Sequence, residues 1–177
     1  TRQQFAVLRG AFELPRVSIV GPAGSGKTVL ALWKLLALLE DGKKAIYVCF
    51  NKSLAEFLKI KYPDASESIV RVDLFFSDLV GASGSQGHKD YFSEKLPNMV
   101  LDHSLGLGEE GKYDAIIVDE GQDFGDNRLT ALNFLLREET EGAQWMILSD
   151  QKQDLYQGGE GALLGEEVTF RLYHNCR

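Results

Sequence analysis

Residues 21–28 restrict the possible folds of this chain more than any other segment. They read Gly-Pro-Ala-Gly-Ser-Gly-Lys-Thr, a full match to the pattern G-x-x-x-x-G-K-[ST]. The β-branched run VSIV precedes them and the helix-forming stretch TVLALWKLLALLE follows. Glycines at positions 24 and 26 allow the backbone to curl so that successive N–H groups face one anion. This order of strand, turn and helix predicts a loop that cradles phosphate groups, rather than a glycine-rich turn that contains Lys-Thr by chance.

The loop supplies the first candidate binding residues. They are Gly21, Pro22, Ala23, Gly24, Ser25, Gly26, Lys27 and Thr28. Lys27 is expected to reach the β- and γ-phosphates, which also makes it a candidate catalytic residue, and the Thr28 hydroxyl is expected to ligate Mg²⁺. The helix that starts near Lys27 adds the positive end of its dipole. We interpret the ligand as ATP with magnesium.

Two adjacent acids form the second candidate element. Asp119 and Glu120 follow the apolar run at residues 115–118. In open parallel sheets the chemistry lies at the carboxyl ends of the strands, so both acids are expected beside the phosphate loop. Asp119 is suited to hold Mg²⁺ directly or through water, and Glu120 to orient and deprotonate an attacking water molecule. Strand ends often carry solvated acids, but an upstream phosphate loop makes the pair an indication of hydrolysis.

Short β-branched runs alternate with longer amphipathic stretches along the whole chain. This alternation predicts an α/β fold of the P-loop NTPase type, in which a parallel sheet is covered by helices on both faces. Strands are predicted at residues 17–20, 45–50, 69–72, 115–118, 144–148 and 168–172, and helices at 27–39, 53–60 and 128–137. Residues 81–89 are predicted to form a mobile loop, and residues 90–111 one or two short helices.

Length and charge narrow the class of protein. The 177 residues favour a single domain over positions 1–177, and because the chain begins with Thr1 and ends without a closing element we expect it to be part of a longer protein. The net charge of −7 argues against a broad basic surface for nucleic acid, although a narrow groove can still bind a strand. The two cysteines and the lack of an apolar run of about 20 residues predict a reduced, cytoplasmic protein with no membrane association.

Four segments, in order, resemble the motifs of superfamily 1 helicases of the UvrD/Rep type. Residues 119–124 read DEGQDF, as in the family's DExQD, and residues 49–52 read CFNK, like its strand-end motif that touches the DNA backbone. Residues 150–156, DQKQDLY, resemble G-D-x-x-Q-x-I-Y, and residues 172–177, LYHNCR, resemble L-x-x-N-Y-R. The resemblance implies a first RecA-like ATPase domain that acts on single-stranded nucleic acid, DNA more than RNA, together with a second RecA-like domain.

The resemblance also implies roles for residues outside the loop and the acids. Gln153 would sense the γ-phosphate, Arg177 would place its guanidinium group on that phosphate, and Gln122 would join the same coupling network. Gln4, or its neighbour Gln3, would read the adenine edge. Physical alternatives remain for some positions: Gln153 as a polar turn residue and Asn51 as the cap of the following helix. Phe50 has a similar alternative as a core residue at a strand end.

The chain also departs from the helicase pattern. Cys176 stands where the family has a tyrosine that stacks on adenine, and no aromatic residue follows Tyr156 directly. Residues 72–113 are too few for the inserted subdomain of larger relatives. Two further functions therefore stay open: a regulatory P-loop ATPase with a protein partner and no unwinding activity, and a nucleotide-binding module without turnover. Glu120 argues against the second of these.

Overall fold

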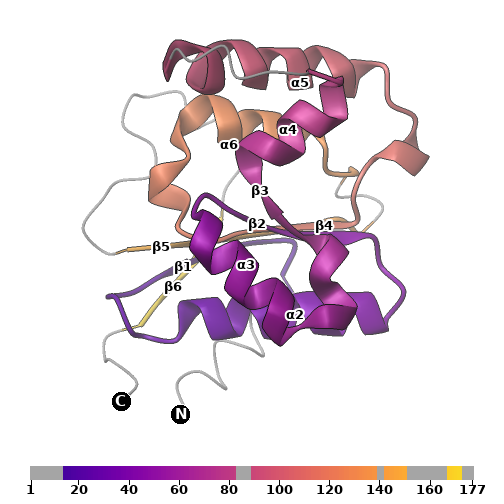
Figure 1. The fold of residues 1–177 in the computed structure, drawn as a ribbon. Helices are drawn as coiled ribbons and strands as arrows, with labels where there is room; N and C mark the ends of the chain where they lie inside the picture. The colour runs from indigo at the N-terminus through magenta and orange to yellow at the C-terminus, as the bar shows by residue number, and fades with distance from the viewer. Residues whose placement is uncertain (1–13, 83–88, 139–141, 151–166, 173–177) are drawn as a thin grey trace.

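A six-stranded sheet forms the centre of the molecule (Figure 1). The computed structural model describes residues 14–82, 89–138, 142–150 and 167–172. The strands are β1 (Arg16–Val20), β2 (Ala45–Cys49), β3 (Ile69–Arg71), β4 (Ala115–Val118), β5 (Gln144–Ser149) and β6 (Val168–Arg171). Their order is β3-β2-β4-β5-β1-β6, and every neighbouring pair is parallel. All six predicted strands are present, with ends that differ by one residue at most.

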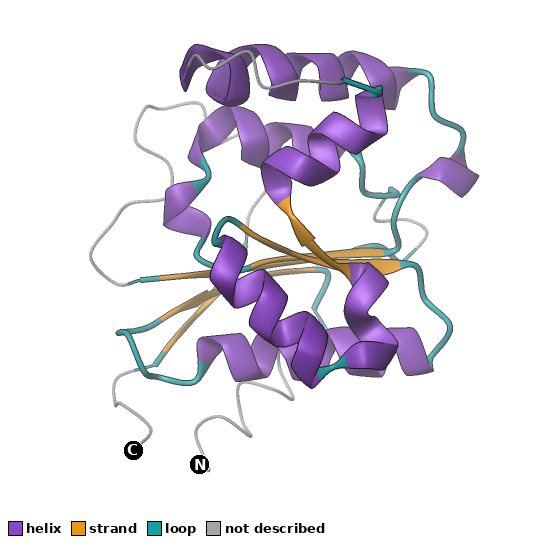
Figure 2. Cartoon of the chain, in the orientation of Figure 1, coloured by secondary structure: helices purple, strands orange, loops and turns teal. Residues whose placement is uncertain are grey.

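Helices cover both faces of this sheet, as predicted (Figure 2). On one face lie α2 (Lys27–Glu40) and α3 (Lys52–Lys61), and on the other lie α4 (Val72–Val80), α5 (Leu96–Leu105) and α6 (Gly125–Phe134). Shorter helical turns are η1 (Pro63–Ser68), η2 (Tyr91–Lys95), η3 (Glu109–Gly111) and η4 (Gly121–Asp123). The α/β prediction is therefore confirmed. None of the helices in the described ranges has the length and apolarity needed to cross a membrane.

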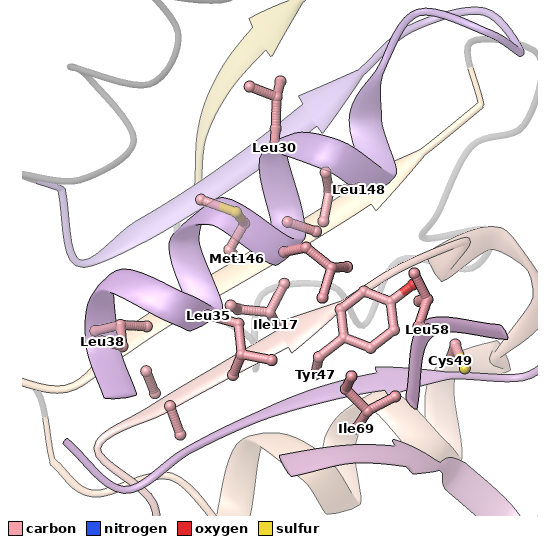
Figure 3. Close-up of a cluster of buried hydrophobic side chains, with 14 of the residues drawn as sticks. Leu30, Leu35, Leu38, Tyr47, Cys49, Leu58, Ile69, Ile117, Met146 and Leu148 are labelled. Carbon is pink, nitrogen blue, oxygen red and sulfur yellow. The ribbon is translucent and has the colours of Figure 1, made fainter. Parts of the chain in front are cut away.

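Alternation along the strands explains why the sheet needs two helical layers. In β2, Tyr47 and Cys49 contact the core under α2, whereas Ile46 and Val48 contact the core under α4 to α6. Successive side chains of a strand point to opposite faces, so a strand that is apolar throughout must be covered twice. Figure 3 shows the first of these cores, in which side chains of α2 lie over β2, β4 and β5.

The three predicted helices are present, two near their predicted bounds and one displaced along the chain. The helix predicted at 27–39 is α2, and the one predicted at 53–60 is α3, with Asn51 as its N-cap through a hydrogen bond from Leu54 N to Oδ1 at 3.1 Å. The helix predicted at 128–137 begins and ends three residues earlier. It ends at Phe134 because the next residues bond to Tyr113, two positions before β4: Tyr113 N donates to Leu135 O, and Arg137 N donates to Tyr113 O, both at 2.9 Å.

Two helices were missed or only partly anticipated. Val72, predicted as the end of a strand, instead begins α4, in which Val72 and Phe76 are buried one turn apart and Gly81 ends the helix at φ 65°. Apolar residues at helical spacing before a glycine were the available signal. The segment 90–111 contains η2, α5 and η3, of which α5 packs with α4 and α6 over the second face and η2 packs with α5 and α6. Most of the loop predicted at 81–89 lies outside the described residues.

Candidate active site

The carboxyl ends of three parallel strands bring the predicted site residues to one edge of the sheet. The strand β1 runs into the loop at 21–26, β4 runs into Asp119, and β5 runs into Asp150. The strand β5 lies between the other two, and Gly21 N donates to Ser149 O at 3.1 Å. The loop and the acids therefore share this edge, as the sequence predicted.

The loop has the backbone conformation that its glycines permit. Gly24 and Gly26 have φ values of 76° and 85°, in the left-handed region that other residues seldom adopt. Within the described ranges, the N–H groups of Ala23, Gly24 and Gly26 donate to no protein acceptor. They stand next to the first turn of α2, so the local field and the donors both favour an anion.

Lys27 lies over the loop rather than in solvent. Its ammonium group donates to Gly21 O at 2.7 Å and Pro22 O at 3.0 Å, and approaches Ser25 Oγ at 3.5 Å. The residue is 6% exposed. A buried ammonium group that is held by carbonyl oxygens is ready to exchange them for the more strongly charged oxygens of a phosphate.

The Thr28 hydroxyl donates to Asp119 Oδ2 at 2.7 Å. Strand periodicity explains the meeting: Asp119 continues the alternation of Ala115 and Ile117, whose side chains face α2. Thr28 stands in the first turn of that helix. Asp119 is 0% exposed, so its carboxylate is removed from water beside the phosphate loop.

Asp119 accepts two further hydrogen bonds. The Tyr47 hydroxyl donates to Oδ2 at 2.6 Å, and the backbone N–H of Glu120 donates to Oδ1 at 2.9 Å. Burial, and after it the charge of Asp119, raises the pKa of Tyr47 far above its ordinary value. Tyr47 therefore remains protonated and acts as a permanent donor. No motif in the sequence indicates this role for Tyr47.

Glu120 occupies a strained turn at the end of β4. Its φ of 54° makes it the one non-glycine residue with a positive φ among the residues described. The Gln122 amide donates to Glu120 Oε2 and accepts from Asp150 N at 3.2 Å through its oxygen. The side chain of Gln122 thus connects the candidate catalytic carboxylate to the end of β5. Strained backbone of this kind is concentrated at functional sites.

Two glycines at this edge are required by close packing. A Cβ atom on Gly121 would lie 2.6 Å from Ile147 Cγ1, and one on Gly21 would lie 2.9 Å from Leu172 Cβ. The contact of Gly21 arises because β6 lies beside β1, with Leu172 N donating to Val20 O at 2.8 Å. The loop and the acidic turn are therefore both fixed against neighbouring strands.

Thr28 and Asp119 fit a magnesium ion by their chemistry. A hydroxyl and a carboxylate oxygen are hard ligands, and Mg²⁺ commonly takes one or two protein ligands together with substrate phosphates. No cluster of three or more His, Cys, Asp or Glu side chains in the described ranges is placed to hold a metal without such help. The donor set therefore suits a metal ion that arrives with a nucleotide.

Gln4, Gln153 and Arg177 lie outside the described residues, as do Cys176 and Tyr156.

The residues of the strand-end motif are described. Phe50 is 42% exposed, which contradicts its alternative as a core residue, and it lies beyond the end of β2. Its ring contacts that of Phe124 at 6.2 Å between centroids, and the Arg128 guanidinium carbon lies 5.1 Å from its centroid.

Residues 16–155 match the AAA domain family, and this range includes the loop, both acids and the end of β5. The chain belongs to the AAA domain family. This assignment and the parallel sheet establish a P-loop nucleotide-binding domain. Among curated proteins, no sequence matches this AAA domain significantly.

Solved structures share the fold of this AAA domain at low sequence identity. The Pif1 helicase of Candida albicans is 15% identical with a TM-score of 0.63, over 98% of this chain and 40% of its own. A Bacteroides Pif1 bound to single-stranded DNA is 17% identical with a TM-score of 0.54, over 99% and 42%. Domain III of the Thermotoga maritima replication initiation protein DnaA is 16% identical with a TM-score of 0.50, over 97% and 60%. The chain thus spans less than two thirds of each of these proteins.

Proposed function

We propose that this AAA domain binds and hydrolyses ATP with Mg²⁺ as the first motor domain of a superfamily 1 helicase or translocase. The observation that carries the proposal is the 2.7 Å hydrogen bond between Thr28 and Asp119, with Glu120 next in the chain. It brings the loop that suits phosphates and the acids that suit hydrolysis to one place. A binding module without turnover would have no need for the carboxylate of Glu120 there.

The roles of the protein groups follow from their positions. The free N–H groups of the loop and the ammonium group of Lys27 bind the phosphates, and Thr28 and Asp119 hold Mg²⁺. The metal ion, when bound, neutralises charge that develops on the phosphate oxygens. Glu120 accepts a proton from the attacking water. Gln122 donates a hydrogen bond to the Glu120 carboxylate and so fixes its position at the end of β4.

Three residues outside the described ranges are assigned by the resemblance of their segments to superfamily 1 helicases. Gln153 follows Asp150 by three positions, and Arg177 follows Leu172 by five. We assign Gln153 to sensing the γ-phosphate, Arg177 to its charge, and Gln4 to adenine.

A surface beside the ATP site suits a nucleic-acid strand. A hollow of about 450 Å³ extends from Phe50 across the end of β3 to α4, and its charged lining residues are Arg71, Asp73 and Asp78. Phe50 offers an exposed aromatic ring, and Phe124 and Arg128 support this ring. Such rings stack with bases of single strands and contribute about 1–3 kcal/mol each. The exposed ring supports single-stranded nucleic acid as partner, whereas the preference for DNA over RNA and the need for a second RecA-like domain rest on the resemblance to superfamily 1 helicases.

The test of the ATPase is a titration with a fluorescent ATP analogue, with and without Mg²⁺. We expect Lys27→Ala to lose at least about 10-fold in affinity, because it removes the charge that faces the phosphates. Lys43→Ala, an exposed lysine at the opposite edge of the sheet, is the control. Equal affinity of Lys27→Ala and wild type would disprove the site.

The test of the motor is made separately, on the longest available protein that contains this domain. Its ATPase rate is measured with single-stranded DNA and RNA, in wild type and in Phe50→Ala. We expect stimulation by a strand and a loss of stimulation in Phe50→Ala, with Phe57→Ala on the outer side of α3 as control. Hydrolysis that no strand stimulates would reject the motor and favour the regulatory ATPase with a protein partner.

A further inference from the structure

Tyr47 brings a hydroxyl group into the core beside the ATP site. The residue is 0% exposed, and its ring rises from β2 among Leu58, Ile69 and Ile117 (Figure 3). A phenolic hydroxyl that is withdrawn from water costs free energy unless it finds a hydrogen-bond partner. A phenylalanine would fill almost the same space without this requirement. Packing alone therefore does not account for a tyrosine at this position.

The partner of this hydroxyl is one particular carboxylate oxygen. Tyr47 pairs with Ile117 in the parallel register of β2 and β4, and Asp119 follows two residues later on the same face. The Tyr47 hydroxyl reaches Asp119 Oδ2 at 2.6 Å, and the Thr28 hydroxyl reaches the same oxygen at 2.7 Å. Tyr47 thus acts on the group that, with Thr28, is proposed to receive the metal ion.

The charge of Asp119 distinguishes this contact from a hydrogen bond that merely satisfies a buried hydroxyl group. The carboxylate is fully buried, and no lysine or arginine in the described ranges forms an ion pair with it. Its donors are two hydroxyl groups and one backbone N–H, which are neutral. Neutral donors fix the direction of a carboxylate without cancelling its charge, so the group stays suited to a cation.

We propose that Tyr47 is a positioning residue for the magnesium site, because its hydroxyl fixes the orientation in which Asp119 and Thr28 together receive Mg²⁺. The inference rests on the proposed binding of ATP with Mg²⁺. The Thr28 hydroxyl approaches Asp119 from α2, whereas the Tyr47 hydroxyl approaches from β2, so the carboxylate is held from two elements. Removing a residue that bonds to a metal ligand typically lowers metal affinity about 10–100-fold.

The test compares wild type with Tyr47→Phe by the binding of a non-hydrolysable ATP analogue at rising Mg²⁺ concentrations. We expect equal affinities without Mg²⁺, and an increase of about 10-fold or more in the Mg²⁺ concentration for half-maximal tightening in the variant. Tyr113→Phe makes the same chemical change at a half-buried tyrosine before β4, at the opposite edge of the sheet, and should match wild type.

Each outcome of this test decides a separate point. The same Mg²⁺ requirement in Tyr47→Phe and wild type would overturn the positioning role and leave Tyr47 as a core residue. A wild-type protein that binds the analogue without any response to Mg²⁺ would overturn both this role and the proposed magnesium site. Tightening in wild type alone supports both.

A second measurement applies if Tyr47→Phe does not fold. The wild-type protein is labelled with 3-fluorotyrosine. Replacing the other tyrosines by phenylalanine one at a time assigns their fluorine signals, and the signal that is present in all of these variants belongs to Tyr47. Mg²⁺ added to the protein with bound analogue should shift the Tyr47 signal more than the Tyr113 signal. A Tyr47 signal that Mg²⁺ leaves unmoved would overturn the proposal.

Discussion

The hydroxyl of Thr28 lies 2.7 Å from the carboxylate of Asp119, although 91 residues separate them in the chain. The order of the strands makes this distance possible, because only β5 separates β1 from β4, and the loop after β1 places the first turn of α2 against the end of β4. The proposed metal-binding pair is therefore a product of the fold and not of either motif alone.

Thr28→Val tests this pair, since valine keeps the shape of threonine and removes the hydroxyl. We expect the affinity for an ATP analogue with Mg²⁺ to fall by about 10-fold or more, which corresponds to about 1.4 kcal/mol. Affinity without Mg²⁺ should change less. Isothermal titration calorimetry with and without Mg²⁺ checks the prediction, with Thr28→Ser as a control that retains the hydroxyl. Wild-type affinity of Thr28→Val in Mg²⁺ would contradict it.

Glu120→Gln separates binding from hydrolysis. Glutamine keeps an oxygen that can accept from Gln122 but cannot take a proton from water, so the rate of ATP hydrolysis should fall about 10²–10⁴-fold. Affinity for ATP should stay close to that of wild type. Steady-state phosphate release and equilibrium binding measure the two quantities, and the exposed Glu110→Gln serves as control. Undiminished hydrolysis in Glu120→Gln would remove this residue from its role.

The sequence was sufficient where a motif or an alternation acts within one element. The side of the sheet that Asp119 faces follows from the alternation of the run before it, and the conformation of the loop follows from Gly24 and Gly26. Tyr47 was not predictable in this way. Its link to Asp119 depends on β2 and β4 being neighbours in the sheet, although the chain forms α3, β3, α4 and α5 between these two strands.

 The two strands pair in parallel register, from Ala45 with Ala115 to Val48 with Val118. The contact itself joins residues 72 positions apart, Tyr47 and Asp119. Periodicity within a strand carries no information about which strand lies beside it, so this part of the site became visible only in the fold.

The charge of Lys34 gives the stability of the domain a specific pH dependence. Burial in α2 lowers the pKa of Lys34 from 10.5 to about 8, against a smaller opposite effect of Asp41. Between these values the unfolded chain binds a proton that the folded chain releases, so the free energy of unfolding should rise as the pH increases from about 8 to 10.5. The gain in the free energy of unfolding is complete above the pKa of Lys34 in the unfolded chain, 10.5, and is lost as the pH falls through its pKa in the folded protein, about 8.

Lys34→Met isolates this contribution, because methionine has a similar length and no charge. The difference in unfolding free energy, wild type minus Lys34→Met, should increase over pH 8 to 10.5 and stay constant below about pH 7. Urea unfolding at several pH values measures it, and the exposed Lys43→Met should show no such rise. A difference that is flat across the whole range would show that Lys34 keeps its ordinary pKa.

Gly121→Ala probes the contact between the acidic turn and β5. The added Cβ would lie 2.6 Å from Ile147 Cγ1 and 2.7 Å from Cδ1, so the side chain of Ile147 must move. Overpacking of this kind costs about 1–3 kcal/mol, whereas Gly108→Ala, with no atom within 4 Å of its Cβ, should change stability by less than about 0.5 kcal/mol. A double variant tests the same contact.

Ile147→Ala removes both clashing atoms and leaves a cavity, which the methyl group of Gly121→Ala partly fills. The variant that carries both substitutions should therefore be more stable than the sum of the two single effects predicts, as measured by urea unfolding. If the two changes in unfolding free energy were strictly additive, the packing of residue 121 against Ile147 would not contribute to stability, and other contacts would hold the acidic turn.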